Sequence, residues 1–116
     1  MTDVDRLLDL ARDGASDELV AAVDAGVPVD TADPAGNSLL MLAAYHGHVE
    51  TVRALVERGA DPDLANANGQ TPVGGTVFKG HDDVTRLLLE AGADPDAGQP
   101  PARQMAHMLG RTDLIP

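Results

Sequence analysis

Four histidines are the side chains of this sequence best suited to metal chemistry: His46, His48, His81 and His107. Protein zinc sites combine imidazoles with thiolates or carboxylates, and two histidines from one helix commonly stand four residues apart. The chain has no cysteine, and no two of its histidines have that spacing. We therefore predict no metal site and no cofactor, and we expect His48 and His81 to cap or pack against the preceding turn.

Residues for catalysis are equally sparse. Ser16 and Ser38 are the only serines, and neither lies in a Gly-x-Ser-x-Gly turn. Ser38 precedes an apolar segment and Thr71 precedes Pro72, which suits two helix N-caps. Residues 74–80 contain the glycines of a phosphate-binding loop but not its Gly-Lys pair followed by serine or threonine. The sequence therefore favours a protein that is not an enzyme.

The charge balance limits the classes of partner. The 116 residues include 8 basic and 19 acidic side chains, for a formal net charge of −11, and Lys79 is the single lysine. Nucleic acids and anionic membranes require a basic patch, which this composition does not favour. No apolar run approaches the ~20 residues of a membrane span, and no apolar signal segment is visible at the N-terminus. We expect a cytoplasmic protein.

Glycines at a fixed spacing define the elements that must position these side chains. Three pairs share one and the same separation: Gly36 and Gly69, Gly47 and Gly80, and Gly59 and Gly92. Apolar residues 39–45 precede Gly47, and residues 49–57, with apolar side chains at helical spacing, precede Gly59. Glycine just after a helix end adopts the left-handed conformation at low cost. The pattern predicts an all-α solenoid, in which short helix pairs bury their apolar faces by stacking.

The repeat divides a single domain, residues 1–116, into four units. Residues 33–65 and 66–97 form two regular units, between an N-terminal capping unit at 2–32 and a truncated C-terminal capping unit at 98–116. In the N-terminal cap we expect the first helix to carry Val4, Leu7, Leu8 and Ala11, and the second helix to carry Leu19, Ala22 and Val23. In the C-terminal cap we expect the first helix to carry Met105, Ala106 and Leu109.

The regular units resemble the ankyrin repeat family in residues 42–50, 55–61, 68–72 and 88–94. The resemblance implies stacked helix pairs with projecting β-turn fingers, and a non-catalytic module that binds a partner protein through its concave face. The sequence departs from the family pattern at Met41 and Gly74, where the family motif Thr-Pro-Leu-His places a histidine that ties neighbouring repeats together.

Gly74 and Gly75 fall inside a predicted helix, where each costs about 1 kcal/mol relative to alanine. One explanation is close packing, in which small residues let a neighbouring helix approach. The other is a soft helix that adjusts when a partner binds at Phe78. Equal hydrogen-exchange protection at residues 74–78 and 42–45 would exclude the soft helix.

The period also locates residues that would face a partner. The candidates are the residues just before each inter-helix glycine and residues of the turns beside them: Arg12, Tyr45, His46, Phe78, Lys79, Met108, Asn37 and Gln70. Tyr45 and Phe78, the only aromatic residues, occupy equivalent positions, and aromatics and arginine often dominate interface energies. The alternative is that the two rings fill the seam between helices and that Asn37 and Gln70 only shape their turns.

Aspartates recur near the predicted turns, at Asp30, Asp61, Asp63, Asp94 and Asp96. Hydrogen bonding within turns explains each of them singly, whereas their summed charge favours the steering of a basic partner. Asp61 and Asp63 lack the ligand spacing and the loop glycine of a calcium-binding EF-hand.

The leading hypothesis is a small monomeric adaptor that binds an unidentified protein. The alternative is a structural protein that self-associates through the same patch or through the C-terminal cap, where we expect Leu114, Ile115 and Pro116 to be exposed. Light scattering at rising concentration separates the two, because a strict monomer does not self-associate.

Overall fold

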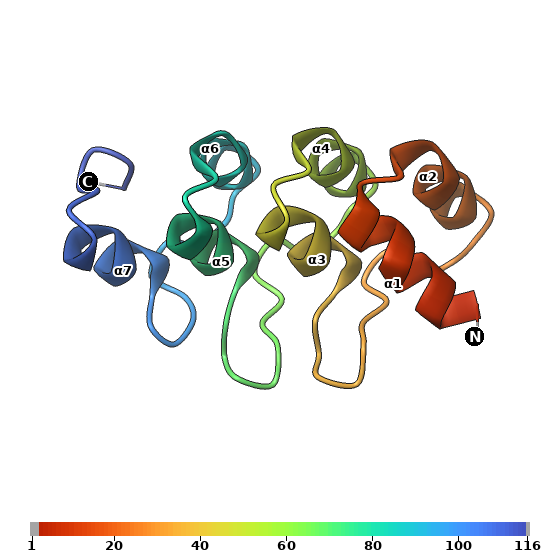
Figure 1. Ribbon diagram of the computed structural model, residues 1–116, viewed down its shortest axis with the longest axis horizontal. Coiled ribbons are helices and arrows are strands. Elements are labelled where there is room, and N and C mark those ends of the chain that lie inside the picture. The colour runs from red at the N-terminus through yellow and green to blue at the C-terminus, as the bar shows by residue number, and fades with distance from the viewer. Residues whose placement is uncertain (1–2, 116) are drawn as a thin grey trace.

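The computed structural model describes residues 3–115, whose helices lie in two rows (Figure 1). The first row contains α1 (Asp3–Asp13), α3 (Leu39–Tyr45), α5 (Pro72–Lys79) and α7 (Ala102–Met108). The second row contains α2 (Ser16–Asp24), α4 (Val49–Glu57) and α6 (Asp82–Glu90). Each helix packs on the next helix of its own row, and α1, α3 and α5 also pack on the second-row helix that follows them in the chain.

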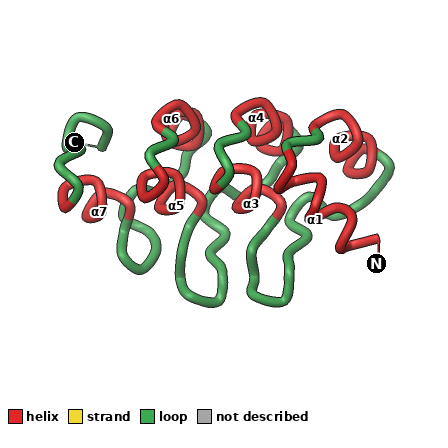
Figure 2. Tube along the Cα trace, in the orientation of Figure 1, coloured by secondary structure: helices red, strands yellow, loops and turns green. Residues whose placement is uncertain are grey.

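Long loops connect successive units and project from the first row, away from the second row (Figure 2). Within residues 3–115 the structure has no β-strand, and its isolated bridge joins Ala32 to Ser38 at the base of one loop. The glycine spacing therefore predicted the all-α solenoid correctly. The stack measures 40 × 24 × 20 Å.

The helix boundaries follow from the residues at their ends. Ser38 and Thr71 have extended backbones, and their hydroxyl oxygens accept hydrogen bonds from the backbone N–H three residues later, at 3.0 and 3.2 Å. Pro72 stands in the first turn of α5, where the missing N–H would have no helical partner. After α3 and α5, Gly47 and Gly80 have left-handed φ angles of 76° and 78°.

Leucine, valine and alanine fill the core between the two rows. Leu39, Leu40, Ala43 and Ala44 make α3 buried on nearly every side. The small alanines let the first-row helices pack closely, which compensates for the scarcity of large rings. Leu19, as predicted, is fully buried in the first unit.

Two expectations for the capping units are wrong. Val4 lies on α1, as expected, but it is 43% exposed because the first turn of α1 extends past its neighbours (Figure 1). Leu109 is 52% exposed because it follows α7 as its C-cap, and Ala102 is buried on that helix instead. Leu114 and Ile115 do not form an exposed stub: both fold back into the hydrophobic core and are buried. Pro116 lies outside the described residues.

One histidine ties each regular unit to the unit before it. Nε2 of His48 lies 2.6 Å from the Arg12 carbonyl oxygen, and Nε2 of His81 lies 3.1 Å from the Tyr45 carbonyl oxygen. Neither side chain caps the helix that it precedes. The expected capping role is therefore corrected to a hydrogen bond across the unit boundary.

The glycine of the preceding unit makes room for this contact. A Cβ on Gly47 would lie 2.8 Å from the His81 ring, so glycine is required there both by φ and by close approach. In the last unit Arg111 occupies the position that corresponds to His81, and its guanidinium pairs with Asp82 of the preceding unit. This ion pair holds the pKa of Asp82 below its usual value.

Aspartates connect the backbones of successive loops. The carboxylates of Asp30 and Asp63 accept hydrogen bonds from the backbone N–H of Asp61 and Asp94 in the following unit, at 3.0 and 2.8 Å. Asp61 and Asp94 also accept hydrogen bonds from the backbone N–H two residues later. Turn hydrogen bonding therefore accounts for Asp61 and Asp94, and bonds between successive loops account for Asp30 and Asp63.

Candidate functional site

Two adjoining cavities lie between the first-row helices and the projecting loops, and we call them together the groove. They share Met41, Tyr45 and Gln70. The polar cavity, of about 340 Å³, extends from these residues towards Arg12. The glycine-floored cavity, of about 190 Å³, extends in the opposite direction, towards Met105 of α7.

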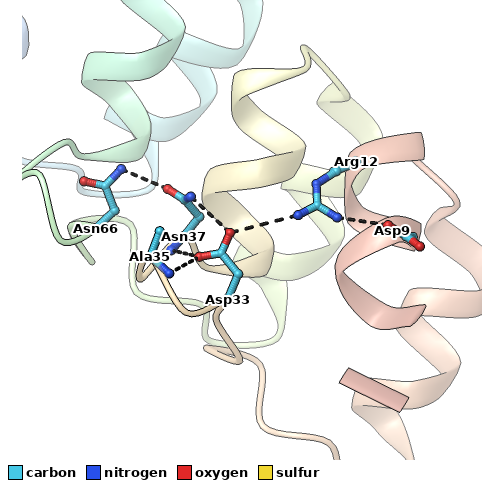
Figure 3. Close-up of polar contacts among 6 residues, drawn as sticks. All are labelled: Asp9, Arg12, Asp33, Ala35, Asn37 and Asn66. Atoms are coloured by element: carbon cyan, nitrogen blue, oxygen red, sulfur yellow. Dashed lines mark hydrogen bonds and ion pairs between the residues drawn. The ribbon is translucent and has the colours of Figure 1, made fainter. Parts of the chain in front are cut away.

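Hydrogen bonds organise the polar cavity around Asp33 (Figure 3). Its carboxylate accepts bonds from the backbone N–H of Ala35 and Asn37, at 3.0 and 2.8 Å, and from the Asn37 side-chain amide at 3.1 Å. A guanidinium nitrogen of Arg12 lies 4.0 Å from the carboxylate. Burial raises the pKa of Asp33, but these hydrogen bonds and the Arg12 charge outweigh burial and bring the pKa below its usual value. Asp33 is therefore ionised at neutral pH.

An uncharged amide takes the place of this carboxylate one unit later. Asn66 is equivalent to Asp33, and its Nδ2 donates hydrogen bonds to Asn37 Oδ1 at 2.9 Å and to Gln70 Oε1 at 2.8 Å. Its Oδ1 accepts bonds from the backbone N–H of Asn68 and Gln70, both at 3.0 Å. The hydrogen-bonded chain thus runs along the loops from a charged end to a neutral end.

Aromatic and cationic side chains meet at the wall between the two cavities. The Lys79 ammonium lies 5.2 Å from the centroid of the Tyr45 ring, within cation–π range. The His46 ring meets the Tyr45 ring edge-on, with centroids 5.8 Å apart. Desolvation lowers the pKa of His46, and positive charge at His48, Arg12 and Lys79 lowers it further. His46 is therefore mostly uncharged at neutral pH, which leaves the positive charge at this wall to Lys79.

Gly74 and Gly75 form part of the floor of the other cavity. A Cβ on Gly75 would lie 3.2 Å from Tyr45 Cδ1, so the ring rests against the glycine backbone, as close packing requires. Phe78 stands at the rim and is 62% exposed. All the lining side chains, including Met105, are uncharged.

Comparison with known proteins identifies the repeat. The family model described as ankyrin repeats (3 copies) matches residues 7–99, which is most of the chain. This chain belongs to the ankyrin repeat family. Ankyrin repeats generally serve as protein–protein interaction modules, and the family is typically non-enzymatic.

A relative of the chain is named as an ankyrin repeat protein of Pseudomonas aeruginosa, PA3287. The two sequences are 50% identical over 50 residues, which are 43% of this chain and 29% of the relative. The match therefore spans less than a third of the relative's length. The match agrees with the family assignment, but it gives no basis for assigning an activity of the longer protein to this chain.

The ankyrin fold brings most of the predicted partner-binding residues to the groove. The residues that line the polar cavity are Arg12, Asn37, Tyr45, His46 and Gln70. Phe78 joins Tyr45 and Gln70 at the glycine-floored cavity, and Lys79 adjoins both cavities through its contact with Tyr45.

Met108 alone among the predicted residues lies apart from both cavities. It is 72% exposed at the end of α7, while Met105, one turn earlier, lines the glycine-floored cavity. The sequence prediction used the spacing from Gly110 and took no account of how α7 sits against α5. The final loop is shorter, so that Gly110 follows Gly80 more closely than Gly80 follows Gly47, and this changes the relation of the helix to the groove.

The sequence prediction also missed polar residues that organise the groove. Asp33, Asn66 and Gln99 occupy one position in three consecutive units, each separated from the next by one full repeat. The first two shape the polar cavity and the third lines the glycine-floored cavity. Their common spacing was a usable signal, because polar residues at one register of a solenoid lie on one face.

Features of other site classes are absent from the part of the chain that the structure describes. No three histidine, cysteine, aspartate or glutamate side chains gather there closely enough to hold a metal ion. None of the helices in that part is both long and apolar enough to cross a membrane. Ser16 shares a hydrogen bond of 2.6 Å with Thr51, and Ser38 caps α3, so both serines have structural partners.

Proposed function

We propose that this ankyrin chain is a small adaptor that binds a partner protein in the groove and catalyses no reaction. One observation carries the proposal: side chains from successive units, selected by their place in the repeat, converge on two adjoining cavities of one face. A protein surface that combines concave apolar pockets with a few fixed polar groups is suited to binding.

Tyr45 and Phe78 are the residues expected to contribute most. Both line the glycine-floored cavity, and Phe78 exposes 62% of its surface in the free chain. Burying a large apolar side chain stabilises a complex by about 1.5–3 kcal/mol. Arg12, Asn37 and Gln70 would orient the partner through hydrogen bonds at the loops.

The test is the double variant Tyr45→Ala, Phe78→Ala. Partners captured from the native cells are identified by mass spectrometry, purified and titrated calorimetrically against the wild-type and variant chains. We expect binding to weaken by about 2–4 kcal/mol, because aromatic hot spots dominate interfaces of this kind. Arg53→Ala, which changes an exposed side chain of α4 away from the groove, is the matched control. An unchanged affinity after loss of both rings contradicts the proposal.

The partner class follows from charge. A chain with a formal net charge of −11 repels nucleic acids and anionic membranes, so we propose a protein partner. We further propose that the two meet in the cytoplasm. We also propose that the chain works as a monomer. The burial of Leu114 and Ile115 removes the exposed C-terminal stub that favoured self-association. A molar mass that rises with concentration in light scattering would contradict the monomer.

A further inference from the structure

The glycine-floored cavity exists because α5 lacks two side chains that α3 carries. Gly74 and Gly75 stand one full repeat after Met41 and Leu42, so the four residues occupy equivalent positions in adjacent units. Apart from the backbone of its own helix, a Cβ on Gly74 would have Thr71 Oγ1, at 3.3 Å, as its one neighbour within 4 Å. The space above Gly74 is therefore open to a side chain from elsewhere.

The size and lining of this cavity suit one aromatic ring. A cavity of about 150 Å³ is enough to hold benzene, and this one measures about 190 Å³. The thioethers of Met41 and Met105 line it, and sulfur makes favourable contacts with ring edges. No lining side chain is charged, so the cavity offers nothing to stabilise a buried charge. The Gln99 side chain at the rim can bond a partner's backbone.

The one lysine of this acidic chain lies beside the cavity. The Lys79 ammonium is 5.2 Å from the Tyr45 ring centroid, and Tyr45 Cδ1 comes within 3.2 Å of the Cβ position of Gly75. No acidic side chain in the described part of the chain forms an ion pair with Lys79. Its charge is therefore available to a carboxylate that approaches the cavity mouth.

We propose that the glycine-floored cavity receives an aromatic side chain of the partner protein, from a segment that carries a carboxylate next to that residue and places it at Lys79. This inference rests on the proposed function and names the chemistry that the partner presents. The aromatic ring fills the space left by Gly74 and Gly75, between Met41 and Met105.

The first test uses the full chain with isotope-labelled methionine methyl and backbone amide groups. N-acetyl-phenylalanine amide is titrated as the probe, with N-acetyl-alanine amide as its control. We expect saturable NMR shifts at the amides of Gly74 and Gly75 and at the methyl groups of Met41 and Met105, but not at Met108. A millimolar dissociation constant is the ordinary value for a fragment of this size. No saturable shift, or equal shifts with the alanine probe, would overturn the aromatic site.

A variant that fills the cavity then tests whether the open space above Gly74 binds the probe. Gly74→Met restores the side chain that α3 carries at this position, and Ala91→Met adds the same side chain at an exposed site just after α6. We expect Gly74→Met to weaken binding of the phenylalanine probe about tenfold or more, while Ala91→Met leaves it unchanged. Removing an interior glycine favours the helix, so thermal unfolding should show an intact fold. If Gly74→Met distorts the fold, Gly74→Ala places a smaller side chain in the same open space. A fully folded filling variant that binds the probe as tightly as wild type contradicts the proposal.

The proposed pairing of Lys79 with a carboxylate of the partner is tested with N-acetyl-Phe-Glu amide and N-acetyl-Phe-Lys amide at low salt. We expect the glutamate peptide to bind about threefold to tenfold more tightly, and Lys79→Gln to abolish the difference. Arg86→Gln removes an equal charge from an exposed position on α6 and should preserve the difference. Equal binding of the two peptides to the wild-type chain would overturn the carboxylate assignment.

The two proposals fail in different ways. If the probes do not bind but the Tyr45 and Phe78 double variant loses its protein partner, the aromatic site is wrong and the proposed function stands. If the probes bind at the glycine floor but that double variant keeps its partner with full affinity, the cavity is a ligand site and binding in the groove is wrong as the protein's function.

Discussion

The units built on α3 and α5 share one backbone plan and differ in what they offer to a ligand. In the α3 unit, Met41 and Leu42 are buried, and the charged Asp33 organises the loop beside them. In the α5 unit, glycines replace the two apolar residues and the neutral Asn66 replaces Asp33. The shared backbone arrangement therefore determines where the helices lie, and a few side chains determine whether the cavity beside each helix is polar or apolar.

Equivalent residues of the two units allow this comparison to be tested pair by pair. The first two tests change one residue in the α3 unit and its counterpart in the α5 unit, and the third changes His46, whose counterpart is Lys79. The expected effect on stability decreases from the glycines that join the units, through the polar residues of the loops, to His46 beside Tyr45.

The largest difference is expected between Gly47→Ala and Gly80→Ala. The φ angles are 76° and 78°, so left-handed strain of about 1–2 kcal/mol is common to both changes. Only at Gly47 would the new Cβ meet a neighbour, the His81 ring at 2.8 Å, whereas nothing lies within 4 Å of a Cβ at Gly80. We expect Gly47→Ala to lower the free energy of unfolding by about 3 kcal/mol and Gly80→Ala by about 1–2 kcal/mol.

Urea denaturation monitored by circular dichroism measures both values. The variant His81→Ala, Gly47→Ala serves as the control, because it removes the ring that the new methyl group would strike. If Gly47→Ala and Gly80→Ala cost the same, the histidine contact contributes nothing beyond backbone strain, and the two unit boundaries are equivalent in this respect.

An intermediate effect is expected from Asp33→Asn, which gives the first loop the uncharged side-chain type of Asn66. The pKa of Asp33 is lower in the folded chain than its usual value of 3.8. Folding therefore gains stability from this group above pH 3.8, and the gain is lost as pH falls through the lower folded pKa. We expect the asparagine variant to lose less stability than wild type in this acid range.

Unfolding free energies measured from about pH 5 to about pH 2 provide the check. Asn66→Asp makes the reciprocal change. We expect the unfolding free energy of this variant to fall more steeply with decreasing pH than that of wild type, because the backbone N–H groups that bond Asn66 would also bond a carboxylate. Parallel pH profiles for wild type and Asp33→Asn would show that Asp33 has the same pKa folded and unfolded, contrary to the geometry of its hydrogen bonds.

The smallest effect is expected at His46, the counterpart of Lys79. Burial and neighbouring positive charges lower the pKa of His46 below its usual 6.5 in the folded chain. The unfolded chain then binds more protons between these two pKa values, so stability falls as pH drops through this window. His46→Gln should remove that part of the decline. NMR titration of the four histidine rings measures it directly, and a His46 pKa at or above 6.5 would contradict the assignment.

The helices were predictable because their signals are local and repeated. Residues 39–45 and 49–57 were predicted from apolar spacing and closing glycines, and they coincide with α3 and α4. The caps Ser38 and Thr71 were predicted for the same reason, since a capping side chain contacts its own helix.

The groove was only partly predictable, because its shape depends on contacts between units. The repeat brought Tyr45 and Phe78 to one face, but the choice of Met105 over Met108 depends on how α7 packs against α5. Likewise, Leu114 and Ile115 were expected at the surface because the chain there is too short for a second helix. Only the folded geometry brings them onto the core.

Three side chains at the unit boundaries point the same way along the chain. His48, His81 and Arg111 each reach from a later unit to an earlier one, to a carbonyl oxygen in two cases and to Asp82 in the third. Since a ribosome releases the N-terminal end first, each newly emerged unit meets an anchoring point that has already been synthesised. Each of these three ties can therefore form as soon as its own unit has emerged.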